Sequence, residues 1–251
     1  MTSELLAAVA FLTRFRVPIP SRAFTGAAAY GLVGAAIGAA GALPLLALGG
    51  RLPLAAGGIA VAVLALVSGG LHLDGLADTA DALAAPNPEA ASRARRDPRI
   101  GAAGAAALTV AVVVDAGLLA SLVELAGPRT AALGCVIATA GSRTLGPAIA
   151  WLLRRRRSKG DRSAGLGGWF IEHATARGSS IALTSSLGIA AVASSVTQEP
   201  AFAIGLVGGM ISSFLVAAWL WRVRGGLDGD GFGFIVEVGF ALILLVTVLA
   251  L

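Results

Sequence analysis

Long apolar stretches separated by short polar segments run along nearly the whole chain. Seven of them approach or exceed the roughly 20 residues that a helix needs to cross a bilayer. They lie at 26–50, 53–71, 101–126, 130–153, 179–197, 201–221 and 234–251. Only helices satisfy their own backbone hydrogen bonds within lipid, so the pattern predicts an all-α fold. We expect a polytopic transmembrane helical bundle of about seven spans, with residues 1–251 forming a single integral membrane domain.

The composition agrees with a bilayer as the solvent. Hydrophobic residues make up 57% of the 251 residues and charged residues 13%, against about 25% charged in soluble domains. The mean hydropathy is +0.85. Small residues such as Gly34, Gly38, Gly205 and Gly209 recur within the spans, which predicts close helix packing. The single cysteine, Cys135, excludes an intrachain disulfide and argues against a cysteine-based metal site.

Basic residues fall almost entirely on one side of the predicted membrane. Alternating spans place the N-terminal segment and the second, fourth and sixth loops together. That side holds 16 of the 19 Lys and Arg residues: Arg14, Arg16, Arg22, Arg93, Arg95, Arg96, Arg99, Arg154, Arg155, Arg156, Arg157, Lys159, Arg162, Arg177, Arg222 and Arg224. The positive-inside rule makes it cytoplasmic. We therefore expect a multi-pass protein of the cell membrane, inner or plasma, with an active site formed by cytoplasmic loops.

Three aspartates in the second cytoplasmic loop carry the strongest chemical signal. Asp74, Asp78 and Asp81 are spaced i, i+4 and i+7, which puts them on one narrow face of a helix. Carboxylates stacked in this way repel each other, and a divalent cation would neutralise them. An oxygen-only ligand set favours Mg²⁺ or Mn²⁺ over Zn²⁺. The alternative, a solvated acidic helix start favoured by the dipole, accounts for Asp74 but not for Asp81. His72 is either a ligand or acid–base group or a polar residue at the membrane boundary.

Two further segments on the same side are candidates for the same pocket. One is Asp97-Pro98-Arg99-Ile100-Gly101, and the other is the glycine-rich stretch 225–233. Glycine-rich turns can direct amides toward phosphate, and aspartates within them can face a metal. Asp230 and Glu237 would share a helix face, whereas Asp228 is expected to point to water.

Charged residues also occur within the predicted spans, where they are costly and usually functional. They are Asp115, Glu124, Arg143 and Glu237. Arg143 either pairs with one of the acids or binds a phosphate, and Glu124 lies near the outer end of its span.

These residues together resemble the cobalamin synthase family, the adenosylcobinamide-GDP ribazoletransferases. The matching segments run nearly end to end: Phe11–Pro18, Gly69–Asp81, Asp97–Gly101, Ser142-Arg143, and Gly225–Asp230 with Gly233 and Glu237. The sequence departs from the family pattern at three positions: Ala82 replaces a usual glycine, Pro98 a frequent serine and Asp228 a frequent threonine. These departures affect the expected loop geometry.

The resemblance implies a reaction and a set of roles. A ribose hydroxyl of α-ribazole, or of α-ribazole 5′-phosphate, attacks adenosylcobinamide-GDP. Adenosylcobalamin, or its 5′-phosphate, and GMP are formed with the help of Mg²⁺. The catalytic candidates are Asp81, as the base by analogy with CDP-alcohol phosphotransferases, with Asp78 and His72. The metal candidates are Asp74, Asp78, Asp81, Asp97, Asp230 and Glu237, and the substrate-binding candidates are Arg99, Arg143, Gly225, Gly226 and Gly229.

Two other functions stay open from the residues alone. One is a different membrane phosphotransferase that moves a CDP- or GDP-linked group onto a lipid alcohol. The other is a transporter that uses Asp115, Arg143 and Glu237 as a coupling path. The expected partners are the two substrates and the lipid bilayer, without nucleic acid, and the sequence leaves homo-oligomerisation open.

Overall fold

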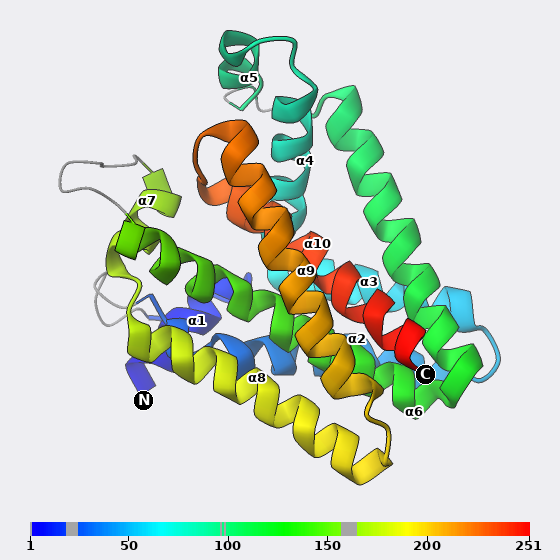
Figure 1. Ribbon diagram of the computed structural model, residues 1–251. Helices are drawn as coiled ribbons and strands as arrows, with labels where there is room; N and C mark the ends of the chain where they lie inside the picture. The colour runs from blue at the N-terminus through cyan, green and yellow to red at the C-terminus, as the bar shows by residue number, and fades with distance from the viewer. Residues whose placement is uncertain (1, 19–24, 96, 98, 157–164) are drawn as a thin grey trace.

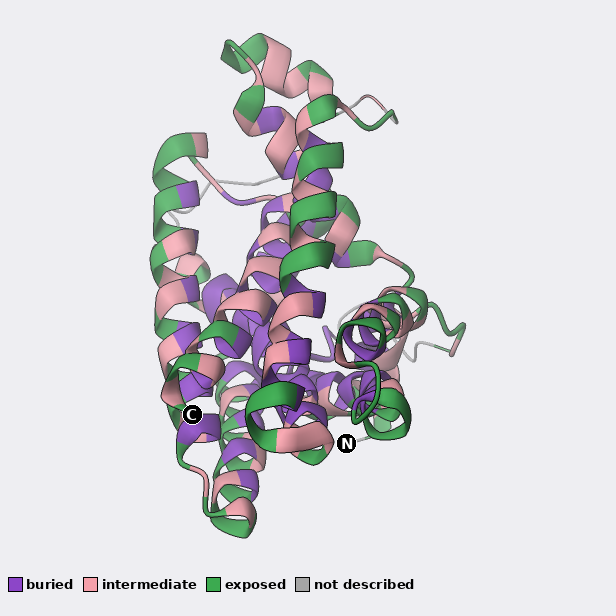
Figure 2. Ribbon diagram, turned by 90° about the vertical axis from the view of Figure 1, so that its right-hand side faces the viewer, coloured by how far each residue is buried: buried purple, intermediate pink, exposed green. Residues whose placement is uncertain are grey.

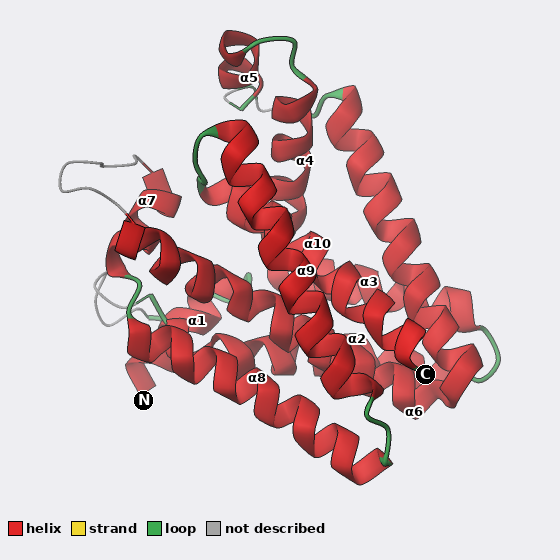
Figure 3. Ribbon diagram, in the orientation of Figure 1, coloured by secondary structure: helices red, strands yellow, loops and turns green. Residues whose placement is uncertain are grey.

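Helices form the secondary structure throughout the part of the chain that the computed structural model describes, residues 2–18, 25–95, 97, 99–156 and 165–251. No strand occurs within these residues (Figure 3). The elements are α1 (Thr2–Leu12), η1 (Ala27–Ala29), α2 (Tyr30–Leu48), α3 (Pro53–Ser68), α4 (Leu71–Ala84), α5 (Pro88–Ala94), α6 (Ala102–Arg156), α7 (Gly165–His173), α8 (Ala176–Thr197), α9 (Ala201–Arg224) and α10 (Gly229–Ala250). The predicted all-α fold is confirmed. Of the basic residues, Arg22, Arg96, Arg157, Lys159 and Arg162 lie outside the described residues.

The long apolar helices match the predicted spans. Among the described residues, five helices are long and apolar enough to cross a membrane, or six if the bent pair α3 and α4 is one span. The longest, α6, has 55 residues and is broken at Gly127, whose φ and ψ are 86° and 169°. A straight helix of that length would extend about 80 Å, far beyond a hydrocarbon core of about 30 Å. It therefore contains both predicted segments, 101–126 and 130–153, while the total of seven stays a prediction.

The connections between helices gather at two ends of the molecule (Figure 1). The α2–α3 turn, the break within α6, the α8–α9 connection and the C-terminus lie toward the lower right of the view. The α4–α5 segment, α7 and the α9–α10 connection lie toward the top and left. This division agrees with the two sides that the basic residues predict, and it places the candidate site segments at one end.

A sharp bend separates α3 from α4. The two helices meet at an angle of 97°, and the residues between them, Gly69 and Gly70, have φ values of 68° and 73°. Two successive residues in the left-handed region favour glycine, which has no Cβ to clash. The bend ends the apolar helix and turns the aspartate-bearing helix α4 so that it packs against α10 and α6.

The interior contains buried charged side chains, and the outside is strongly apolar. Arg143 and Asp115 are both only 3% exposed, whereas Leu215 and Leu249 are 68% and 76% exposed. Figure 2 shows the buried residues concentrated between the helices, with exposed residues along their outer faces. An apolar exterior of this kind fits a bilayer as the surrounding solvent.

Small residues bring the helices into close contact, as predicted. A Cβ added at Gly38 would lie 2.7 Å from Val136 Cα of α6, and one added at Gly34 would lie 2.9 Å from Ala140 Cα. A Cβ added at Gly209 of α9 would lie 2.5 Å from Ile243 Cα in α10. These contacts fix α2 against the second half of α6 and α9 against α10, which is the usual role of small residues in membrane bundles.

Candidate active site

The aspartate-bearing helix α4 packs directly against the start of α10. A Cβ added at Gly75 would lie 2.8 Å from the carbonyl oxygen of Asp230 and 3.0 Å from Gly233 Cα. The two backbones can approach this closely only because Gly75 has no side chain. Asp228, Asp78 and Asp74 are in consequence the acidic neighbours of Asp230. The structure thus brings the predicted aspartate cluster and the glycine-rich loop to one place.

Two cavities meet at Asp74. The smaller, about 270 Å³, is lined by Asp74, Asp230, His72 and Arg143, together with an aromatic wall. The larger, about 1000 Å³, is lined by Asp74 and Asp78 and by basic and acidic residues of the loops, namely Arg14, Arg95, Asp97 and Arg99. Asp74, Asp78 and Asp230 therefore span the junction between the smaller, aromatic-lined cavity and the larger, charged one.

Asp81 is held by the beginning of α6. Its Oδ2 accepts a hydrogen bond from the Gly101 backbone N–H and its Oδ1 accepts one from the Gly104 N–H, both at 2.8 Å. These donors belong to the first turn of α6, where backbone N–H groups have no partner within the helix, and the helix dipole favours a carboxylate there. Asp81 lies on α4 as predicted, but in this conformation both of its oxygens are occupied by backbone donors.

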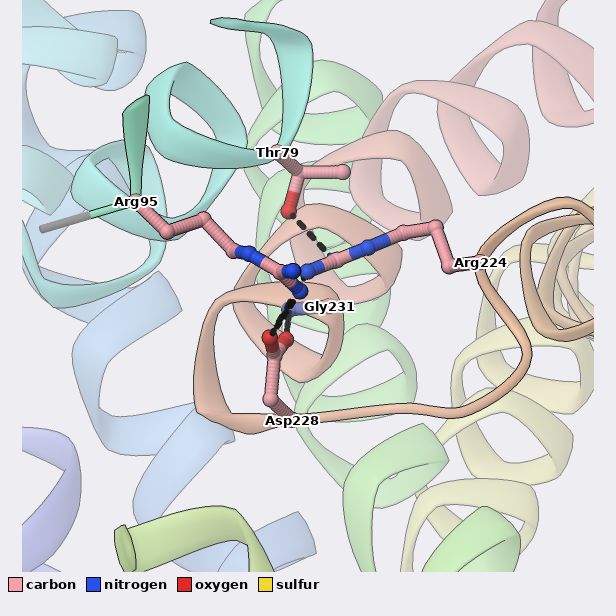
Figure 4. Close-up of polar contacts among 5 residues, drawn as sticks. All are labelled: Thr79, Arg95, Arg224, Asp228 and Gly231. Atoms are coloured by element: carbon pink, nitrogen blue, oxygen red, sulfur yellow. Dashed lines mark hydrogen bonds and ion pairs between the residues drawn. The ribbon is translucent and has the colours of Figure 1, made fainter. Parts of the chain in front are cut away.

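Asp228 fastens the glycine-rich loop, as Figure 4 shows. Its Oδ2 accepts hydrogen bonds from Arg224 Nη2 at 2.7 Å and from Arg95 Nη1 at 3.2 Å. Its Oδ1 accepts one from the Gly231 N–H at 2.9 Å and so caps α10. Arg224 Nη1 also donates to Thr79 Oγ1 of α4 at 3.3 Å. The expectation that Asp228 points to water is wrong, because two arginines and a helix terminus converge on its carboxylate.

These contacts also set the pKa of Asp228. Partial burial raises the pKa of this carboxyl, but the Gly231 N–H and the positive charges of Arg224 and Arg95 outweigh burial, and the pKa lies below its ordinary value. The carboxylate is therefore ionised at neutral pH and ties α4, the segment after α5, and the start of α10 together.

Asp97 and Arg99 form a two-pronged ion pair at the wall of the larger cavity. Arg99 Nε donates to Asp97 Oδ1 at 2.9 Å, and Arg99 Nη2 donates to Asp97 Oδ2 at 2.8 Å. Hydrogen bonding to Arg99 lowers the pKa of Asp97 to about 2. Both predicted residues thus reach the site, while Pro98 between them lies outside the described residues.

A second polar group lies deeper among the helices. Arg143 Nη2 is 3.9 Å from Glu237 Oε1, and His72 Nδ1 is 4.0 Å from the same oxygen. Asp115 shares a small cavity with Arg143 and Glu237. Arg143 therefore pairs with an acid and also lines the smaller cavity, so both of its predicted roles remain compatible. Glu237 lies next to Arg143 and His72, seven residues further along α10 than Asp230.

The predicted ligand and substrate residues are thus only partly brought together. Within the described ranges, no group of three or more His, Cys, Asp or Glu side chains is arranged to hold a metal ion. Among the glycines, Gly229 lines the smaller cavity. Gly225 and Gly226 line neither of the two cavities and have open space where a Cβ would stand.

Sequence reasoning missed the aromatic wall and helix α7. Phe11, Tyr30, Phe170 and Phe232 line the smaller cavity from four different elements. Helix α7 contacts the glycine-rich loop, since a Cβ added at Gly167 would lie 2.5 Å from the Gly229 nitrogen. The sequence offers one sign of α7: the run Gly165–Phe170 carries no charge, unlike the basic segment that precedes it.

The fold and the site together define a polytopic helical membrane protein with an acidic, arginine-flanked candidate site at one end of its bundle. The family described as cobalamin-5-phosphate synthase matches the chain over residues 4–248. The chain therefore belongs to that family, and it is an enzyme, a transferase of cobalamin biosynthesis.

Three named relatives are similar in sequence to this chain over nearly its full length. The chain is 32% identical to the adenosylcobinamide-GDP ribazoletransferase of Citrobacter koseri, across 98% of this chain and 99% of that protein. It is 34% identical to the ribazoletransferase of the same name from Rhizobium johnstonii, across 90% and 88%. A third relative with that name, from Escherichia coli, is 33% identical across 98% and 99%. No solved structure is significantly similar to this chain.

Proposed function

We propose that this protein joins adenosylcobinamide-GDP to α-ribazole, or to α-ribazole 5′-phosphate, at the cytoplasmic face of the cell membrane. The products are adenosylcobalamin, or its 5′-phosphate, and GMP. The observation that carries the proposal is the position of Asp74, which lines both cavities. A transferase must bring two substrates to one reacting atom, and two compartments that share one carboxylate offer that arrangement.

The larger cavity suits the donor. Its volume, about 1000 Å³, is at the upper end of the range typical of ligand sites, and Arg14, Arg95 and Arg99 line it. Arginine side chains bind phosphate oxygens well because their planar donors match the geometry of the anion. We assign the pyrophosphate of adenosylcobinamide-GDP to this cavity.

Asp74 is placed to accept the proton of the attacking ribose hydroxyl. The hydroxyl oxygen forms a bond to the phosphorus on the cobinamide side, the bond from that phosphorus to the bridging oxygen breaks, and GMP leaves with that oxygen. A general base must lie within hydrogen-bond reach of the proton that it removes. Asp81 was the candidate by analogy, but its two oxygens accept backbone N–H bonds. We therefore give Asp81 a positioning role.

The carboxylates at the junction also fit Mg²⁺. Asp78 and Asp230 come from facing helices and supply hard oxygen donors next to the phosphate cavity, and Mg²⁺ commonly binds through one or two carboxylates with water and substrate phosphates. When bound, the ion would neutralise charge on the phosphates. Asp97 and Glu237, by contrast, are committed to Arg99 and Arg143.

The test is acceptor-dependent GMP release from adenosylcobinamide-GDP by the purified protein in liposomes. We expect GMP only when α-ribazole or its 5′-phosphate and Mg²⁺ are both present. Asp74→Asn should reduce the turnover rate about 100-fold or more, the usual contribution of a positioned base. The matched control, Glu89→Gln on the exposed helix α5, should keep full turnover. GMP release without an acceptor, or transfer only to a lipid alcohol, would contradict the proposal.

A further inference from the structure

We propose that the aromatic end of the smaller cavity binds the base of the acceptor, so that this protein recognises α-ribazole through its flat dimethylbenzimidazole ring. The inference rests on the proposed function and assigns one of its two substrates to a place. It concerns Phe11, Tyr30, Phe170 and Phe232, which the sequence did not single out as site residues.

The four rings form a continuous wall. Phe11 and Phe170 have ring centroids 5.7 Å apart with planes at 13°, and Tyr30 lies 5.9 Å from Phe170 with planes at 23°. Phe232 meets Phe170 edge-on, at 5.8 Å and 77°. Three nearly parallel rings and one perpendicular ring form one aromatic cluster that lines the cavity. Such a wall favours a flat aromatic ligand, which can stack in offset or edge-to-face geometry.

Size separates the two substrates. A cavity of about 270 Å³ lies just below the roughly 300–1,000 Å³ of sites that enclose drug-sized ligands. It can take a fused two-ring base, whereas a corrinoid macrocycle is far too large for it. The same cavity reaches Asp74 and Asp230 at its polar end. A nucleoside with its base among the aromatic rings therefore has its ribose directed toward the carboxylates.

Three residues that line this cavity also carry a buried polar atom without a hydrogen-bond partner in the described part of the chain. Tyr30 is 2% exposed and its hydroxyl has no hydrogen-bond partner in the described part of the chain. The same holds there for His72 Nδ1 and Arg143 Nε, in residues that are 5% and 3% exposed. Unpaired buried polar groups are costly. A ligand can relieve this cost, since the free ring nitrogen of a benzimidazole accepts one hydrogen bond and ribose hydroxyls both donate and accept.

The four aromatic side chains favour dimethylbenzimidazole over the guanine of adenosylcobinamide-GDP. Guanine carries several donors and acceptors along its edge, and each would lose a water partner in an aromatic compartment. The aromatic end provides a single hydroxyl, that of Tyr30. Dimethylbenzimidazole has no donor on its ring once it is joined to ribose, and its methyl groups gain from apolar burial.

The experiment compares both substrates in Phe170→Leu and Tyr30→Phe. Leucine keeps an apolar side chain at position 170 but removes the stacking face, so it tests recognition with a smaller risk to folding than alanine. In Phe170→Leu, loss of one base-stacking contact should raise the KM for α-ribazole about tenfold. In Tyr30→Phe, loss of one hydrogen bond should raise it about fivefold. In both variants the KM for adenosylcobinamide-GDP should be unchanged. The matched control is Trp219→Leu, an aromatic residue on the outer face of α9 that is 49% exposed. It should leave both KM values as they are.

A second measurement does not depend on turnover. Free 5,6-dimethylbenzimidazole should bind the wild-type protein in a calorimetric titration, compete with α-ribazole but not with the donor, and bind about tenfold more weakly to Phe170→Leu. Guanosine should not displace it.

The outcomes separate the two proposals. Binding of the free base without any GMP release would uphold the base site and reject the proposed reaction. Normal turnover with a raised KM for the donor, or displacement of the base by guanosine, would overturn the base site and assign the aromatic cavity to guanine. Unchanged KM values in both variants would overturn it as well.

Discussion

Replacing Asp228 by alanine should loosen the junction between α4 and α10. The carboxylate caps α10 through Gly231, and loss of such a cap costs about 1 kcal/mol, with a range of about 0.5–2. Arg224, whose side chain is 7% exposed, would lose its carboxylate partner and keep only the bond to Thr79. Leaving a buried donor unpaired adds about 1–3 kcal/mol, whereas the more exposed pair with Arg95 contributes about 0–1 kcal/mol. The expected total is about 2–5 kcal/mol.

Asp228→Asn separates these contributions. Asparagine caps helices about as well as aspartate, so only the interaction with the arginines is lost and we expect at least half of the alanine effect. Thermal unfolding in detergent at pH 7 should rank the melting temperatures as wild type, Asp228→Asn, Asp228→Ala. As a control, Asp97→Ala removes a solvent-exposed pair with Arg99 and should change the midpoint little. Equal melting temperatures for Asp228→Ala and the wild type would refute the reasoning.

The same contacts predict a pH dependence with a definite sign. The pKa of Asp228 is lower in the folded protein than its ordinary value, which is about 3.9 in an unfolded chain. Its stabilisation is therefore fully present above that pH and is lost as the pH falls through the lower, folded pKa. The difference in stability between the wild type and Asp228→Ala should be constant near neutrality and narrow below about pH 4. A difference that widens on acidification would be inconsistent with this sign.

The remaining predictions concern the helix junctions and the topology. Asp81→Asn should lower the free energy of unfolding by about 1–2 kcal/mol, because its amide nitrogen cannot accept one of the two α6 hydrogen bonds. An unchanged melting temperature together with abolished turnover would instead support Asp81 as the general base. Gly75→Ala should strongly reduce turnover by forcing α4 away from α10, whereas Gly58→Ala, with nothing within 4 Å of the added Cβ, should be tolerated; equal activities would argue against the α4–α10 contact. Reporter fusions at Asn87 and Leu251 should report opposite sides of the membrane, and finding both on one side would exclude an odd number of spans between these two positions.

The candidate site was partly readable in the sequence because some of its signals are local. The spacing of Asp74, Asp78 and Asp81 predicts a shared helix face, and α4 is a helix over all three. The sequence could not show that Asp81 bonds to Gly101 and Gly104, at separations of 20 and 23 residues. Those partners depend on where α6 begins in space, which no periodicity along α4 encodes.

The aromatic cavity was hidden for the same reason. Phe11, Tyr30, Phe170 and Phe232 are spread over more than 200 positions and sit on α1, α2, α7 and α10. Each is an ordinary apolar residue in its own segment, where burial in a core or in lipid is the default expectation. Only the packing of four elements turns them into one wall.

The sequence by itself determined that this protein is a helical membrane protein, because apolar length and the backbone's need for internal hydrogen bonds are properties of single segments. Its motifs likewise determined the family. The tertiary structure alone decided which charges are free to act and which are held. Asp228 meets Arg95 across 133 residues of sequence, and Asp74 is shared by two cavities. Charged side chains interact through space over distances of a few ångströms. Their partners are therefore set only when helices far apart in sequence pack together.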